Sequence, residues 1–224
     1  MEMDIITSQQ NLQEKRASLN ILSRPDGSVI FSQGETTVLA GCYGPIEAKS
    51  QKILTDKVCV EVYYRPKSGI PSIGDRSYEA IIKNVCEVAL VTSLYPRTSI
   101  MIVLQEMQNC GGLISCAINA ACAALLDAGV DMKFLIGAVS CAINEDNIIK
   151  LEPPALEWEN SKAGFLFVFD SFEGRIVASH TTGSFSVNQF KEALKTCRDA
   201  SGAVFKYFRD KMKENVMTND LKTD

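Results

Sequence analysis

A Gly-Gly turn between an apolar strand and a helix is the first feature of this sequence that suggests chemistry. Residues 101–104 form an apolar run of strand length, Asn109-Cys110-Gly111-Gly112 interrupts it, and nearly every residue from 113 to 127 favours a helix. The first N–H groups of a helix have no intrahelical partner, and the helix dipole adds positive potential around them. The turn is therefore a candidate anion site, and phosphate is the anion that it suggests.

Carboxylates in the C-terminal half suggest a second chemistry, the binding of Mg²⁺ for hydrolysis. Magnesium prefers carboxylate and water oxygens, and four acidic side chains could supply them. These are Glu152, Glu157, Glu159 and Asp170. A zinc site has little material, because His180 is the only histidine and the cysteines contain no C-x-x-C pair.

Basic residues gather after the strand that ends near Tyr64. Arg65 and Lys67 lie in a loop containing Pro and Gly, and Arg76 lies at the start of the next helix. The chain as a whole carries a net charge of −4, which argues against nucleic-acid binding over its whole surface. The three cations therefore predict a local RNA contact or, as the alternative, an ordinary solvated loop.

The elements that must position these groups alternate between sheet and helix. The helix over residues 113–127 is apolar on more than one stripe and should be wrapped on most sides. In chain order we expect strands over residues 29–31, 36–43, 46–50 and 58–64, a helix from about 75 to 93 capped by Asp75 or Ser77, a strand over 98–105, the helix over 113–127, two hairpins (134–144 with 148–151, and 164–170 with 175–180) and a last helix over 187–213.

Composition and punctuation narrow the class of protein. Hydrophobic residues make up 46% of the 224 residues, and no apolar run approaches the ~18 residues of a membrane span. The first residues lack the basic and then apolar pattern of a secretory signal, so we expect a protein of the cytosol or nucleus with no membrane partner. The eight cysteines lie in apolar patterns and are predicted to be reduced core residues.

Three ordered motifs carry a resemblance to a known family. GGLISCAINAACAALLDA (residues 111–128), RPDGSVIFSQGETTVLAGCYGP (24–45) and TTGSFSVNQFKEALKTC (181–197) resemble segments of the RNase PH-type phosphorolytic exoribonucleases. The resemblance implies the RNase PH fold, a duplicated β-α-β-α core in one two-layer α/β domain. That domain is expected over residues 20–213, with 1–19 as a partly ordered lead-in and 214–224 as a polar tail.

The departures from the family pattern bear on catalysis. Leu113 and Ile114 stand where the enzymes place the Thr and Arg that hold phosphate, and an apolar pair cannot make charge-assisted hydrogen bonds. The family's catalytic acids, laid on PPALEWEN, fall on Pro154, Leu156 and Asn160. The resemblance thus implies a retained fold with a degenerate phosphate site and a degenerate acidic site, and no catalytic residue.

Within the family, LSRPDGS, GPIEAK, YPRTSI and AINAAC resemble a ring subunit of the eukaryotic RNA exosome. This implies a six-membered ring of RNase PH-like proteins topped by OB and KH cap subunits. Such a ring takes part in ribosomal RNA maturation and RNA decay in the nucleus, nucleolus and cytoplasm, with no cofactor in this subunit. It places Arg65, Lys67 and Arg76 beside the RNA path. Two alternatives are a residual phosphorolytic or metal-dependent nuclease working as a homo-oligomer, with a homodimer possible for the isolated chain, and an assembly factor that never touches RNA.

Overall fold

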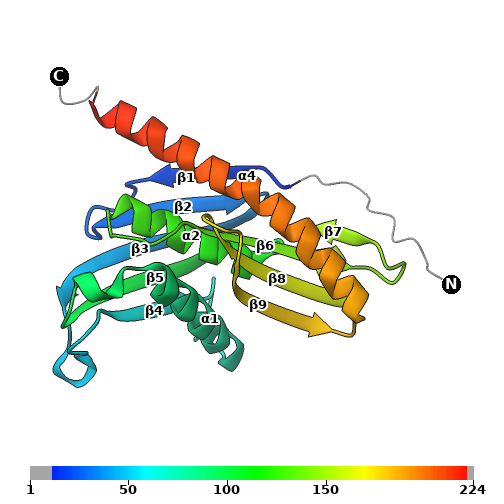
Figure 1. Cartoon of the computed structure of the whole chain (residues 1–224), viewed down its shortest axis with the longest axis horizontal. Coiled ribbons are helices and arrows are strands. Elements are labelled where there is room, and N and C mark those ends of the chain that lie inside the picture. Colours follow the sequence, from blue (N-terminus) through cyan, green and yellow to red (C-terminus); the bar gives the residue numbers. More distant parts are fainter. Residues whose placement is uncertain (1–11, 221–224) are drawn as a thin grey trace.

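The computed structural model describes residues 12–220, so the expectations for residues 1–11 and 221–224 lie outside the described residues. Within this range the chain forms nine strands in two sheets and four α-helices, with short 3₁₀ helices at Ser50–Lys52 and Thr92–Leu94. Each half of the chain contributes one sheet, and the helices pack on them (Figure 1). The α/β class and the division into two halves predicted from the sequence are confirmed.

The N-terminal half builds a five-stranded sheet in the order β1-β2-β3-β5-β4. Neighbours are antiparallel except for β4 and β5, which run parallel and are joined by a crossover through α1. β3 continues through Gly44-Pro45, where the sequence predicted a turn, and a register shift between Tyr43 and Ile46 accommodates this irregular stretch. The strands are β1 (Lys15–Leu19), β2 (Gly27–Gln33), β3 (Thr36–Glu47), β4 (Cys59–Arg65) and β5 (Thr98–Gln108).

The C-terminal half builds a four-stranded antiparallel sheet in the order β7-β6-β8-β9. All residues of β6 and β8 are buried, so both faces of these central strands are covered. β9 forms an edge and is mostly exposed. The strands are β6 (Ile136–Ile143), β7 (Ile149–Leu151), β8 (Ala163–Asp170) and β9 (Ile176–Gly183).

Helix α2 is the centre of the domain. It packs against β2 and β3 of the first sheet, β6 of the second sheet and helix α1, and 11 of its 15 residues are buried. The prediction that this helix is wrapped on most sides is therefore confirmed. Helix α4 crosses the second sheet and reaches β1 (Figure 1). The helices are α1 (Ile73–Ala89), α2 (Leu113–Asp127), α3 (Ala155–Glu159) and α4 (Val187–Asp220).

The start of α1 differs from the sequence prediction. The N-cap is Ser72, whose hydroxyl accepts the Asp75 N–H, while the Asp75 side chain accepts the Ser72 N–H at 2.7 Å. Asp75 therefore closes a capping box as the third residue of the helix, and the predicted caps Asp75 and Ser77 are wrong. The helix ends at Ala89, before the predicted end at residue 93.

Both ends of the domain carry more regular structure than the sequence predicted. β1 lies within residues 1–19, the predicted lead-in, where it pairs with β2 and buries Ala17. A five-residue edge strand with one buried side chain gives no periodic signal. Helix α4 continues to Asp220, beyond the predicted boundary at residue 213, because no Gly or Pro follows Gly202 to interrupt it.

Two further expectations concern membranes and thiols. Among residues 12–220, no helix combines the length and the apolarity needed to cross a bilayer. All eight cysteines are free thiols, as predicted. Six are buried, whereas Cys59 and Cys110 are only partly covered.

Candidate functional site

The Gly-Gly turn adopts a backbone that favours glycine. Gly111 has φ 110° and Gly112 has φ 60°, and Gly112 is the N-cap of α2 without any side-chain cap. A Cβ atom on Gly111 would lie 2.6 Å from the Pro153 carbonyl oxygen and 2.8 Å from the Ala155 nitrogen. The turn therefore requires glycine at position 111 for conformation and for space.

Hydrogen bonds fix this turn to two distant parts of the chain. The Thr36 hydroxyl donates to the Gly111 carbonyl at 2.7 Å and accepts the Cys110 N–H at 3.0 Å. The Ala155 N–H donates to the Cys110 carbonyl at 2.8 Å. The start of β3 and the segment after β7 thus hold the turn between them.

A buried ion pair holds the segment after β7. Lys15 on β1 lies 3.0 Å from the Glu152 carboxylate, and the two side chains are 6% and 1% exposed. The Gln13 backbone N–H donates to the same carboxylate at 2.8 Å, and the Gln13 side chain donates to the Glu152 carbonyl at 2.7 Å. Because a buried carboxylate without its cation is costly, this contact ties the N-terminal strand to the wall of the turn.

A pocket of about 220 Å³ opens beside the turn, and its lining does not suit phosphate. Leu113 and Ile114, at the positions of the family's phosphate ligands, line it together with the turn itself. None of the described residues lining this pocket is a lysine or arginine, and Glu159 adds a carboxylate. The remaining named walls are Tyr78, Trp158, Leu166, His180 and Thr182. The helix N-terminus is retained, but the side chains around it would repel an anion or leave it unbound.

The three degenerate acidic positions do not gather at this pocket. Pro154 touches the turn, since its carbonyl carbon would lie 2.9 Å from a Cβ on Gly111. Leu156 is 76% exposed, and the exposed Asn160 side chain donates back to the Leu156 carbonyl at 2.9 Å. Both of these residues line a separate hollow. Of the α3 side chains, it is Trp158 and Glu159 that reach the pocket beside the turn.

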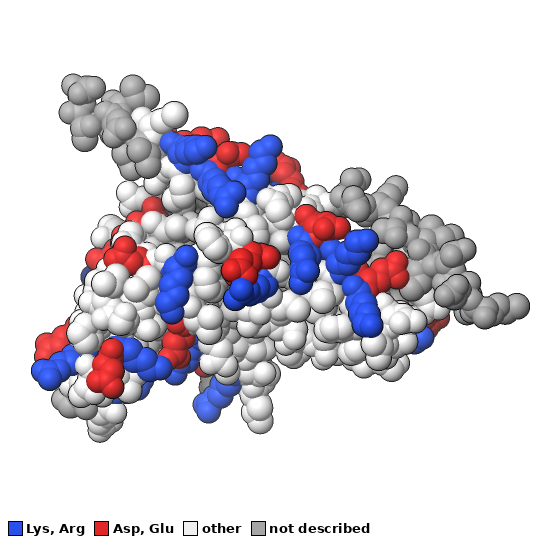
Figure 2. Space-filling model, in the orientation of Figure 1, with Lys and Arg blue, Asp and Glu red and all other residues white. Residues whose placement is uncertain are grey.

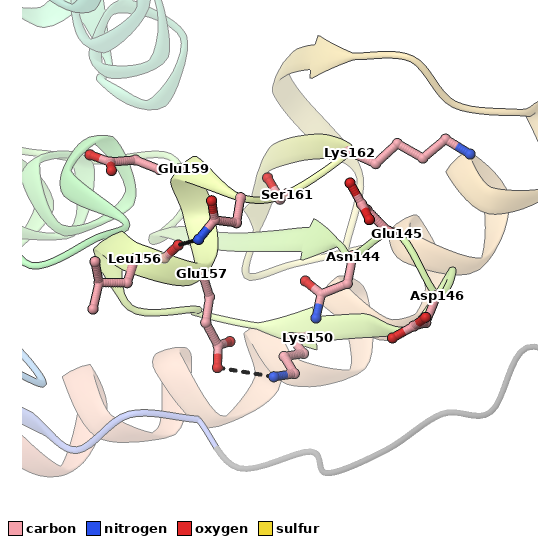
Figure 3. Close-up of a pocket in the computed structure, with 10 residues that line it drawn as sticks. Asn144, Glu145, Asp146, Lys150, Leu156, Glu157, Glu159, Ser161 and Lys162 are labelled. Carbon is pink, nitrogen blue, oxygen red and sulfur yellow. Dashed lines mark hydrogen bonds and ion pairs between the residues drawn. The ribbon is translucent and has the colours of Figure 1, made fainter.

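That second hollow, of about 1030 Å³, lies between the β6–β7 turn and α3 (Figure 3). Asn144, Glu145 and Asp146 line one side, and residues of and after α3 line the other. Lys150 and Glu157 form a half-exposed ion pair of 3.0 Å on its floor. Acidic side chains outnumber basic ones in the lining, which therefore favours a cationic partner.

The predicted magnesium ligands are dispersed, and that alternative is wrong as stated. Glu152 and Glu157 are each paired with a lysine. Asp170 accepts two backbone N–H groups of the β8–β9 turn, and Glu159 faces the pocket beside Gly112. No group of three or more histidine, cysteine or acidic side chains in residues 12–220 is placed to hold a metal ion.

Arg65 and Arg76 come together where the sequence predicted a basic patch. Arg65 ends β4, Arg76 lies in the first turn of α1, and both line a groove of about 390 Å³. Lys67 is exposed in the connecting loop but does not line this groove. Among the described contacts none of the three forms an ion pair.

The acids nearest these cations are already occupied. Asp75 serves the capping box with Ser72, and the Glu79 carboxylate accepts the Tyr64 N–H at 2.8 Å. On the face shown in Figure 2, basic and acidic side chains are interspersed, so no broad cationic field covers it. An anion would therefore be attracted to this face of the protein only locally.

Thiol chemistry is suppressed behind the turn. Burial raises the pKa of Cys116, on α2 directly after the turn, to about 12. Its sulfur lies 3.7 Å from the carbonyl oxygens of Phe31 and Thr36. Cys116 therefore stays a neutral packing residue and is no nucleophile.

Sequence reasoning missed Lys15, Gln13 and Thr36 as supports of the site. Thr36 lies within the Gly-x-Thr-x-Val segment of the family resemblance, so a signal for it existed, although its partner at the Gly-Gly turn could not be read from it. Lys15 had no local signal, because its partner is 137 residues away.

Known proteins share both the sequence and the fold. Residues 12–131 match the RNase PH description "3′ exoribonuclease family, domain 1". The chain is 34% identical over 215 residues to a protein of Arabidopsis thaliana named exosome complex exonuclease RRP46 homolog, covering 88% of this chain and 90% of that protein. The crystal structure of rice (Oryza sativa) Rrp46 matches with a TM-score of 0.87 and 29% identity, over 91% of this chain and 96% of the other.

A more distant likeness concerns the fold alone. The archaeal exosome core matches with a TM-score of 0.76 at 16% identity, over 89% of this chain and 87% of the other. Together with the closer matches, it confirms the fold that the motifs implied.

Proposed function

Because the chain belongs to the RNase PH family of 3′ exoribonucleases, we propose that it is a non-catalytic subunit of an exosome-type ring. In this role it acts in 3′-to-5′ RNA processing and decay, including ribosomal RNA maturation and RNA surveillance. Its partners are other RNase PH-like subunits and OB and KH cap subunits, in the nucleus, nucleolus and cytoplasm. The names of its relatives, which are exosome components, support this assignment.

The observation that carries the non-catalytic part is the lining beside the Gly-Gly turn. The backbone of the turn is retained, yet Leu113 and Ile114 supply no hydrogen-bond donor from their side chains, and Glu159 adds negative charge. Loss of one positioned donor commonly reduces a rate by about 10²–10³. Phosphorolysis needs phosphate bound beside the scissile bond, so this subunit contributes structure to the ring.

We further propose that Arg65, Lys67 and Arg76 line the RNA path. Their side chains are exposed and free of intramolecular ion pairs within residues 12–220, and two of them share one groove. Contacts of this kind bind phosphates and position RNA without reading its sequence. An assembly factor that never touches RNA would not need these groups unpaired.

The experiment is RNA binding by the reconstituted ring as a function of salt. Replacing Arg65, Lys67 and Arg76 by Ala should weaken binding for every RNA sequence and reduce the slope of log affinity against log salt concentration. A matched variant replaces Lys191, Lys195 and Lys206, three exposed lysines of α4, by Ala and should retain the wild-type slope. Equal slopes for the two variants, in intact rings, would contradict the proposed RNA path.

Ring membership itself is tested by co-expression with other RNase PH-like subunits. The proposed function predicts a stable complex that survives size-exclusion chromatography. Elution of this chain apart from every RNase PH-like subunit would contradict it, whatever the outcome of the RNA measurement.

A further inference from the structure

The loop between β4 and α1 exposes the two least covered large apolar side chains among the described residues. Ile70 is 92% exposed and Ile73 is 91% exposed. Burying an isoleucine is worth about 1.5–3 kcal/mol, so two fully exposed neighbours in sequence mark a surface that a partner covers. The Ser72–Asp75 capping box and the positive φ of Gly69 shape this loop.

The same loop carries cations whose partners lie outside the chain. Ile70, Arg65 and Arg76 line one groove, and Lys67 is exposed beside it. Because Asp75 is occupied by the Ser72 cap and Glu79 by the Tyr64 N–H, the nearby carboxylates do not neutralise them. The loop is thus an apolar tip with a basic surround, and its complement is an acidic hollow with an apolar edge.

The second hollow of this chain has that complementary character. Of its acidic side chains, only Glu157 pairs with a lysine within residues 12–220, which leaves Glu145, Asp146 and Glu159 available. In Figure 3, Glu145 and Asp146 project from the β6–β7 turn on one side, while Leu156, 76% exposed, lies at the far rim. The hollow, of about 1030 Å³, is large enough to receive a loop tip.

We propose that the basic apolar loop of one copy of this chain docks into the acidic hollow of a second copy. The loop belongs to the N-terminal half between β4 and α1, whereas the hollow lies beside β7, in a different part of the molecule (Figure 1). The contact is therefore heterologous: a different surface of each copy takes part, and repetition of such contacts closes rings. The inference deepens the partner side of the proposed function, but it concerns the isolated chain and needs no RNA.

The test is the mass of nuclease-treated protein in solution, measured by light scattering. Two charge-reversed variants are compared, a loop variant (R65E/K67E) and a hollow variant (E145K/D146K), each checked for wild-type folding by circular dichroism. Wild type should exceed the 24.6 kDa of one chain as concentration rises, while each variant alone should stay at one chain. An equimolar mixture of the two variants should associate again, because each reversed surface then meets a reversed partner.

Several outcomes would overturn the proposal. These are a wild type of one-chain mass at every concentration, variants that associate like wild type, or variants that stay monomeric even when mixed. The last result would indicate a contact other than loop to hollow.

A third variant separates this contact from RNA binding. I70S/I73S should lose self-association while the assembled ring keeps its wild-type salt slope for RNA. The matched control Phe172→Ser, at an 86% exposed position in the β8–β9 turn, should associate like wild type. If I70S/I73S kept the mass of wild type and lost RNA affinity instead, the loop would be an RNA contact and the docking proposal would fail, whereas the proposed ring function would stand.

Discussion

The turn at Gly111–Gly112 and the loop from Arg65 to Arg76 occupy similar positions in the chain, since each joins a strand to the helix that follows, yet they are held in opposite ways. The turn is fixed by Thr36, by the backbone of Ala155 and, through Glu152, by Lys15 on β1. The loop presents two exposed isoleucines and three unpaired cations. The first region has kept its architecture and lost its chemical groups, whereas the second spends its side chains on partners.

The largest expected effect is at the support of the turn. Lys15→Met leaves the buried Glu152 carboxylate without its cation, and removal of one partner from a buried ion pair costs about 3–5 kcal/mol. The change should lower the free energy of unfolding in urea by that amount. Arg16→Met, next along β1 and paired only with the exposed Glu14, should stay near wild type. If the two variants were equally stable, the pair would not hold the segment after β7.

The turn itself should be nearly as sensitive. Gly111→Ala places a side chain at φ 110° and against the Pro153 carbonyl, so it should destabilise the protein by at least about 1–3 kcal/mol. Gly202→Ala, in α4 with no atom within 4 Å of the new Cβ, should stabilise by about 0.5–1 kcal/mol. Urea unfolding of both variants measures the contrast. Opposite signs are expected, and a neutral Gly111→Ala would contradict the account of the turn.

The buried thiols behind the turn should make stability fall at high pH. Burial raises the pKa of Cys42, Cys116 and Cys122 from 9.0 to about 12, so the folded state retains protons that the unfolded state releases. Their contribution is complete below pH 9 and decreases between pH 9 and 12, by about 1.4 kcal/mol per thiol and pH unit. Cys116→Ala should show a shallower decrease in urea unfolding experiments across this range.

Reactivity at pH 8 offers a second readout of the same burial. A thiol reagent should modify the partly covered Cys59 and Cys110 in the folded protein and all eight cysteines after unfolding. Rapid labelling of Cys116 in the folded protein would show that the region behind the turn opens.

The smallest expected effect is on the loop. Replacing Arg65, Lys67 and Arg76 by Ala should change the free energy of unfolding by less than about 0.5 kcal/mol, because the three side chains form no ion pair in the described part of the chain. The measurement is again urea unfolding. A large loss of stability would mean that these cations support the fold, and the contrast between the two regions would disappear.

Much of this arrangement could be predicted from local patterns. The helix over residues 113–127 matched its observed bounds because it is continuously apolar and lies between a Gly-Gly turn and Gly129. The positions of Leu113 and Ile114 beside a pocket followed from the family resemblance and are found there. Arg65 and Arg76 meet because a strand and a helix start are joined by a short loop.

What could not be predicted depends on contacts between distant residues. β1 carries no periodicity, and the value of Lys15 arises only from Glu152. The acidic positions were assigned by laying a motif on PPALEWEN, but Leu156 and Asn160 point to a different hollow because α3 is a single short helix that turns them away from Gly112. A dispersed set of carboxylates looked like a metal site for the same reason, since sequence spacing gives no information on their three-dimensional separation.

The most direct test of the central claim is phosphorolysis of poly(A) by the purified protein in the presence of inorganic phosphate. The claim is that the Gly111–Gly112 turn has kept its backbone but no longer binds phosphate for catalysis, because Leu113, Ile114 and Glu159 surround it. Release of nucleoside diphosphates should equal that of a buffer control. Phosphate-dependent release well above the control, abolished by a change at the turn, would contradict the account.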